Sequence, residues 1–129
     1  MSKCVMSGVL FAKDARSLKG FYVDVLAGKV LREDPEFALL DWGGFHLVIH
    51  QVPAHLAAAV LVSTPPQRRE QGALRLDYPV DDVPKARDAA RRMGGAIDDA
   101  PPAWAGNDAS FFLGYDPEGN VFGAKTGER

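Results

Sequence analysis

Arg75 and Asp77 are the two residues of this chain whose types and spacing most directly suggest chemistry. They lie two positions apart in LRLDYPV, so in an extended strand both side chains point to the same face of a sheet. A buried guanidinium needs a partner, and Asp77 can supply it in a structural ion pair. Alternatively, the planar fork of Arg75 binds a carboxylate or phosphate of a ligand.

His46 and His50 are the next candidates. The segment FHLVIHQ alternates, with Phe45, Leu47 and Ile49 on one side and His46, Val48 and His50 on the other. The two histidines are about 13 Å apart at the rise of a strand, too far to bind one metal without distortion. They are interpreted either as polar lining at a cavity mouth or as a general base or hydrogen-bond donor to a ligand.

Apolar and aromatic residues complete the candidate site. Strand alternation places Val9 beside Ser7 and Phe11 on one face, and Ala73 beside Arg75 and Asp77. Trp104, in a loop with Pro and Gly, is either core cover or a stacking lid, and Phe111 or Phe112 closes the pocket. The predicted ligand-binding residues are Ser7, Phe11, His46, Val48, His50, Arg75, Asp77, Trp104 and Phe111. A mostly apolar pocket with few polar groups is typical of a small-molecule site.

Two copies of one unit are predicted to position these residues. Asp14 caps a helix that runs to about Leu26 and ends at Gly28, and Asp82 caps one that ends at Gly94–Gly95. The buried helix faces are predicted to be Leu18, Phe21, Tyr22, Val25 and Leu26, and Val83, Ala86, Ala89, Ala90 and Met93. The predicted strands are Val5–Lys13, Lys29–Glu33, Phe37–Trp42, Phe45–Val52, Ala73–Val80, Ala96–Ile97, Ser110–Tyr115 and Val121–Lys125, with a loop over 98–108 and a tight turn over 116–120.

The order β-α-β-β-β occurs twice, which predicts an α+β fold. One helix covers a face of each half-sheet, and the other faces curl into a barrel-like mixed sheet around a shared cavity. We expect a single domain over residues 1–129, with units at about 1–62 and 72–127. The linker over 63–71 contains Arg68 and Arg69, which are predicted to be solvated.

Composition excludes several classes of protein. The 129 residues are 47% hydrophobic, enough for a core, and the net charge of −2 comes without the basic stripe that nucleic-acid binding needs. No apolar run has the length of a membrane span or of a secretory leader. Cys4 has no disulfide partner, is expected to pack as a small apolar residue, and fits a cytoplasmic protein.

Three segments resemble the glyoxalase/bleomycin-resistance/dioxygenase superfamily, the vicinal oxygen chelate fold. They are VLFAKDARSLKGFYVDVLAG, YPVDDVPKARDAARRMGG and YDPEGNVFGAK, and the DPEGN turn is the most family-like feature. The resemblance covers both halves and implies tandem βαβββ units and a homodimer. The fold hosts metal-dependent lyases, dioxygenases, thiol transferases and drug-binding proteins, so it does not decide function.

The resemblance also implies where metal ligands would lie, on the first and last strands of each half. These positions fall on Ser7, Arg75 and Gly123, with the fourth on Val48, or on His46 or His50 after a register shift. Ser, Arg and Gly are not ligands of a catalytic divalent metal, and an Arg there repels a cation. Neither a metal nor another cofactor is therefore expected.

The sequence thus favours a metal-free small-molecule-binding protein of the bleomycin-resistance type, acting by sequestration or sensing, with no assigned catalytic residue. A divalent-metal-dependent enzyme of the superfamily, recruiting His46 or His50 into an atypical ligand set, is the alternative. A domain with a collapsed cavity that serves only association is a third possibility.

Overall fold

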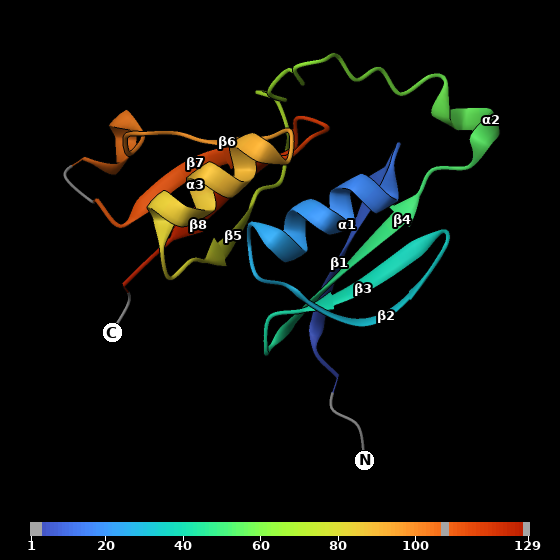
Figure 1. Cartoon of the computed structure of the whole chain (residues 1–129), viewed down its shortest axis with the longest axis horizontal. Coiled ribbons are helices and arrows are strands. Elements are labelled where there is room, and N and C mark those ends of the chain that lie inside the picture. Colours follow the sequence, from blue (N-terminus) through green and yellow to red (C-terminus); the bar gives the residue numbers. More distant parts are fainter. Residues whose placement is uncertain (1–3, 107–108, 128–129) are drawn as a thin grey trace. The chain divides into compact units, whose positions relative to one another are not determined.

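The chain folds into two compact units, Met1–Leu61 and Val62–Arg129, in a computed structural model that describes residues 4–106 and 109–127 (Figure 1). Each unit contains a four-stranded mixed sheet and one long helix. Both units have the order β-α-β-β-β, which confirms the predicted repeat. Both sheets are open rather than closed barrels, with β1 and β2 at the edges of the first and β5 and β6 at the edges of the second.

The first unit orders its strands β1-β4-β3-β2, with β1 and β4 parallel and the other neighbours antiparallel. Its elements are β1 (Met6–Ala12), α1 (Ala15–Asp24), β2 (Lys29–Asp34), β3 (Phe37–Asp41), β4 (Phe45–Gln51) and the short α2 (Ala54–Ala57).

The second unit has the matching order β5-β8-β7-β6, again with only its first pair parallel. Its elements are β5 (Leu76–Pro79), α3 (Val83–Arg92), β6 (Ala96–Ile97), the 3-10 turn η1 (Ala103–Ala105), β7 (Phe111–Tyr115) and β8 (Val121–Lys125). The predicted strands therefore all exist, with ends that shift by a few residues.

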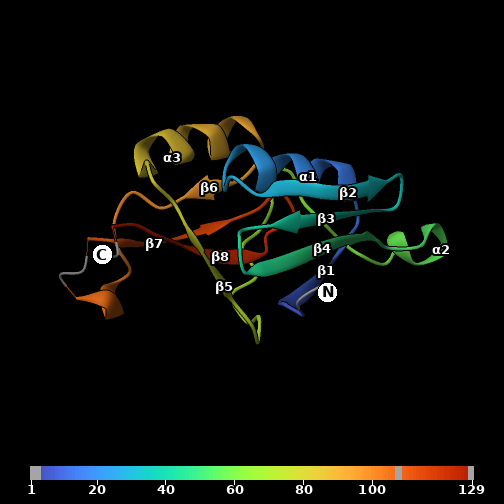
Figure 2. The ribbon, with the colours of Figure 1, turned by 90° about the horizontal axis from the view of Figure 1, so that it is seen from below.

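Both helices form where the sequence predicts them, and each lies along one face of its own sheet (Figure 2). Asp14 and Asp82 cap them, each accepting a hydrogen bond of 3.1 Å from the backbone N–H three residues on. The predicted apolar faces are buried, with Leu18 and Ala90 at 0% exposure and Met93 partly exposed. No described helix is long and apolar enough to cross a bilayer.

The end of α1 differs from the prediction that Gly28 stops the helix through its conformational freedom. Ala27 adopts the left-handed conformation, with φ of +63°, and its N–H donates to the Val23 carbonyl at 3.1 Å. Gly28 is needed for space, because a Cβ there would lie 2.7 Å from the indole of Trp42. The Trp42 Nε1–H donates to the Leu26 carbonyl at 2.8 Å and seals the helix end against β3.

Strand β5 begins at Leu76, so the prediction that it starts at Ala73 was wrong. Among the described residues its hydrogen-bonded neighbour is β8, and Leu76 is paired with Phe122. Continued backwards, this register would place Arg75 opposite Val121 and Leu74 opposite Asn120, which belongs to a turn. Arg75 directly precedes the first residue of the ladder, and Ala73 is not part of a strand face.

Two side chains of the linker are not simply solvated, contrary to the prediction. Arg68 makes hydrogen bonds of 2.7 and 3.2 Å with Asp98 and lies over the Tyr115 ring, and the bonds to Asp98 raise the pKa of the guanidinium. The Arg69 side chain donates from Nε to the Glu118 carbonyl at 3.2 Å, and its backbone N–H donates to the Gly119 carbonyl at 2.9 Å. The linker is therefore bonded to the 116–120 turn through Arg69, whose N–H groups satisfy backbone carbonyls that need donors. Cys4 is likewise exposed, so its predicted packing role was wrong.

The turn between β7 and β8 is organised by a buried carboxylate. Asp116 is 0% exposed, and its Oδ1 accepts hydrogen bonds from the backbone N–H groups of Glu118 and Asn120 at 2.8 and 3.0 Å. The Asn120 side-chain amide donates to Asp116 Oδ2 at 2.9 Å. The predicted tight turn is therefore a closed loop that fixes where β8 begins.

Candidate functional site

A pocket of about 330 Å³ in the second unit combines cationic, aromatic and hydroxyl side chains. It is lined by Arg75, Trp104, Ala105, Ser110, Phe111, Lys125 and Thr126. Three of the predicted site residues thus line one pocket, and Asp77 is bonded to one of them. Its volume lies at the lower end of the range of small-molecule sites.

Sheet register brings these residues together on the face opposite α3. Phe111 pairs with Lys125 and Asp77 pairs with Gly123, so their side chains share one face of the sheet. Phe112 points the other way, where the guanidinium of Arg87 from α3 lies 5.1 Å from its ring. The sequence left open whether Phe111 or Phe112 closes the pocket, and Phe111 is the residue on the pocket side of the sheet.

Gly123 makes the close packing of this face possible. A Cβ at this position would lie 2.7 Å from Phe111 Cε1 and would overlap the Asp77 carboxylate. The Phe111 ring and the Asp77 side chain thus occupy the space above Gly123. Tyr78, the next residue on β5, faces α3, and its burial raises the pKa of its hydroxyl, which stays neutral.

Arg75 and Asp77 form the ion pair that their spacing suggested. Arg75 Nε lies 2.7 Å from Asp77 Oδ1 and Nη2 lies 3.2 Å from Oδ2, a two-point contact that raises the pKa of Arg75. The side chains are 36% and 28% exposed, so this is a surface ion pair and the guanidinium is not buried. With Nε–H and one Nη2–H engaged, the remaining guanidinium N–H groups can still donate to a ligand.

Two aromatic rings flank the Arg75 guanidinium. Its central carbon is 5.0 Å from the Phe111 ring centre and 5.5 Å from the Trp104 ring centre, within cation–π range. The two rings are 5.5 Å apart at an angle of 50°. Trp104 belongs to η1 and is 66% exposed, which favours a stacking lid over core cover.

The other predicted site residues share the face of the first sheet opposite α1. Register pairs Ser7 with His46 and Phe11 with His50, and Val48 lies between the two histidines. Phe11 is 66% exposed, and its ring is 6.1 Å from that of His50. His50 Nδ1 is 3.0 Å from the Gln51 carbonyl oxygen.

Asp41 is a neighbour of His46 that sequence reasoning missed. Its Oδ1 lies 3.4 Å from His46 Nε2, and the hairpin register pairs the two residues. The signal was present, because Gly43–Gly44 joins the predicted strands Phe37–Trp42 and Phe45–Val52, and a two-residue hairpin turn there places Asp41 and His46 opposite each other.

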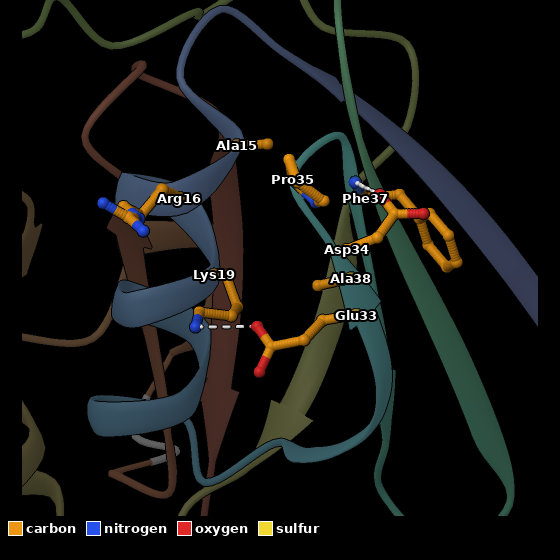
Figure 3. A pocket seen from close by; sticks show the side chains of 8 residues that line it. All are labelled: Ala15, Arg16, Lys19, Glu33, Asp34, Pro35, Phe37 and Ala38. Atoms are coloured by element: carbon orange, nitrogen blue, oxygen red, sulfur yellow. Dashed lines mark hydrogen bonds and ion pairs between the residues drawn. The ribbon is translucent and has the colours of Figure 1, made fainter.

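A second pocket, of about 520 Å³, lies between α1 and the β2–β3 hairpin (Figure 3). None of the predicted site residues lines it. Of its charged residues, Lys19 pairs with Glu33 at 2.9 Å, and Asp34 accepts backbone hydrogen bonds from Glu36 and Phe37. We therefore treat the smaller pocket in the second unit as the candidate site.

The positions that the resemblance assigns to metal ligands do not fit a metal ion. Leu47 and Ile49 are buried on the α1 side, so the fourth position is Val48 rather than a histidine. Arg75 is paired with Asp77, and the space above Gly123 is filled. Within residues 4–106 and 109–127, no three His, Cys, Asp or Glu side chains come together as ligands.

The family model of the glyoxalase-like domain matches residues 7–124. The chain belongs to this family. The match confirms the resemblance to the glyoxalase/bleomycin-resistance/dioxygenase superfamily that the two helix segments and the DPEGN turn indicated. No curated protein matches the chain in sequence.

Solved structures share the fold at low identity. The bleomycin-binding protein of bleomycin-producing Streptomyces verticillus, complexed with copper(II)-bleomycin, is 22% identical, with a TM-score of 0.58 and 99% of each chain covered. The antibiotic-binding protein TnmS3 of Streptomyces sp. CB03234 is 21% identical, with a TM-score of 0.61 and 98% of each chain covered. A glyoxalase/bleomycin resistance protein/dioxygenase family enzyme of Burkholderia phytofirmans PsJN is 22% identical, with a TM-score of 0.66, and the match covers 93% of this chain and 95% of that chain.

Proposed function

We propose that this protein binds small aromatic molecules in the pocket of its second unit, without a catalytic metal, and acts by sequestration or sensing. The observation that carries the proposal is the cluster of Arg75, Trp104 and Phe111 around that pocket. Trp104 offers an exposed ring on which a planar ligand can stack. Arg75, held in place by Asp77, can direct its remaining N–H groups to a carbonyl or hydroxyl of that ligand.

The residues at the family's ligand positions support a metal-free site. An arginine already paired with Asp77 and a glycine beneath Phe111 provide no donor atom for a divalent cation. Two solved structures of this fold support a binding function rather than a catalytic one. One is a bleomycin-binding protein and the other is an antibiotic-binding protein.

The exposed face of the first sheet, considered by itself, carries the other residues that we propose as ligand-binding. Phe11 and Val48 offer apolar surface there, and Ser7, His46 and His50 offer hydrogen bonds. His46, beside Asp41, is the histidine whose orientation is best supported by a neighbour.

The probe for the proposed function is 2-naphthamide, a neutral planar aromatic, titrated before and after dialysis against EDTA. We expect saturable binding that EDTA leaves unchanged. Trp104→Ala removes the stacking surface and should weaken binding about tenfold, the scale of one base-sized stacking contact. Arg75→Met should weaken it several-fold through the lost N–H donors.

The paired change Arg75→Met with Asp77→Asn separates binding from stability. If the double variant regains stability but still binds poorly, Arg75 is a ligand residue. Loss of binding on EDTA treatment would contradict the metal-free site and favour a metal-dependent enzyme of the superfamily. Unchanged affinity in Trp104→Ala would place the ligand elsewhere.

We also propose that the protein is a cytoplasmic homodimer. Each open sheet leaves edge strands and exposed apolar side chains, such as Val9 and Phe11 on β1, that association would cover. Sedimentation at tens of micromolar is expected to give a dimer-sized species, and a single monomer-sized species would contradict this proposal.

A further inference from the structure

Lys125 gives the candidate pocket a positive charge that its other residues do not cancel. Arg75 and Asp77 neutralise each other, and none of the described residues that line the pocket carries a carboxylate. Lys125 is exposed and forms no ion pair with any residue of 4–106 or 109–127. An exposed ammonium that pairs with no carboxylate of the described residues favours a negatively charged ligand.

The position of Lys125 also suits a ligand that stacks on Trp104. Lys125 is the register partner of Phe111, so both side chains leave the same face of the sheet. Ser110 and Thr126 line the same pocket and are held close together by a 2.8 Å hydrogen bond from the Thr126 N–H to the Ser110 carbonyl. The pocket therefore places one ammonium and two hydroxyl-bearing residues beside two aromatic rings.

We propose that the natural ligand of this pocket is an aromatic compound with an anionic group, and that Lys125 is the residue that binds the anion. The inference rests on the proposed binding function and adds the ligand class and the residue that selects it. Arg75 is then a pre-positioned hydrogen-bonding platform, because its charge is already matched by Asp77. The freely rotating ammonium of Lys125 suits a carboxylate as a point charge.

The test compares 2-naphthoate with 2-naphthamide, which have the same shape and differ in charge. We expect the parent protein to bind the carboxylate about five- to tenfold more tightly, on the scale of a partly screened charge-assisted hydrogen bond. Lys125→Met should abolish this preference while 2-naphthamide still binds, and Lys125→Arg should retain it. Added salt should weaken binding of the carboxylate but not of the amide.

Lys85→Met is the matched control. It removes the same charge from an exposed position on α3, the helix that covers the opposite face of the same sheet, and should leave the preference unchanged. A preference that persists in Lys125→Met, or a parent protein that binds both probes equally, overturns the inference while the proposed binding function stands. If the parent binds neither probe, the proposed function itself fails and the inference fails with it.

Discussion

Replacing Asp116 by alanine is expected to lower the free energy of unfolding by about 3–5 kcal/mol, because it breaks several hydrogen bonds to one buried carboxylate. The change leaves the N–H groups of Glu118 and Asn120 without their acceptor, in a turn where Glu118 is itself only 6% exposed. The linker also depends on this turn, because the Arg69 N–H and Nε donate to the carbonyls of Gly119 and Glu118. Urea denaturation followed by circular dichroism measures the loss.

Three variants test whether the loss comes from the buried contacts rather than from the charge. Asp88→Ala removes a carboxylate that is 66% exposed and pairs with Arg91 at the surface, so it should cost less than about 0.5 kcal/mol. In Asp116→Asn, the new side-chain amide faces the amide of Asn120, so two N–H donors meet. Adding Asn120→Asp places a carboxylate acceptor opposite the new amide and restores the hydrogen bond. If this double variant is no more stable than Asp116→Asn, the side-chain contact between the two positions contributes little.

Much of the fold could be predicted because local signals and burial agree. Both helices begin where an Asp caps them, and their apolar faces are the ones that spacing predicts. In β4, alternation correctly placed Leu47 and Ile49 in the core and the histidines on the opposite face. Such patterns are readable because the side-chain period of each element is fixed by backbone geometry.

The parts that sequence reasoning missed depend on partners distant in the chain. The start of β5 is set by where β8 begins, about 45 residues later, and the sequence of β5 carries no sign of it. Gly28 is required by the Trp42 ring rather than by the helix end, and Arg68 finds Asp98 thirty residues away. These are tertiary contacts, which local propensity does not encode.

The candidate site could be predicted only in part, because some of its features also depend on tertiary contacts. Arg75, Asp77, Trp104 and Phe111 were identified from residue type and spacing, and the structure places them around one pocket or bonded to a residue that lines it. Lys125 was not singled out, although it lies two positions after Gly123 and so on the same face of its strand. Its significance appears only once the charge of Arg75 is seen to be matched by Asp77.

Gly123→Ala is expected to damage both the stability of the protein and its binding site, since Phe111 and Asp77 already fill the space that a Cβ needs. We expect a loss of about 2–3 kcal/mol, the range for overpacking a well-packed site. Displaced Asp77 should release Arg75, and displaced Phe111 should open the pocket, so 2-naphthamide should bind at least tenfold more weakly. Gly44→Ala is the matched control, because a Cβ there has no atom within 4 Å. Equal stability and binding in the two variants would contradict this packing.

The same position is one of the four at which the resemblance implies a metal ligand. A Gly123→Glu variant supplies a carboxylate at the position where the resemblance implies a metal ligand on the last strand, but its side chain meets the same filled volume and the positive charge of Arg75. We therefore expect elemental analysis, after dialysis against zinc or manganese and then buffer, to find well below one ion per chain in the variant and in the parent. About one ion per chain in the parent would show that an unrecognised ligand set holds the metal, and His46 and Asp41, 3.4 Å apart on neighbouring strands, would be the first residues to replace. About one ion in Gly123→Glu alone would show that Phe111 and Asp77 yield easily, and that this glycine is what keeps the site free of metal.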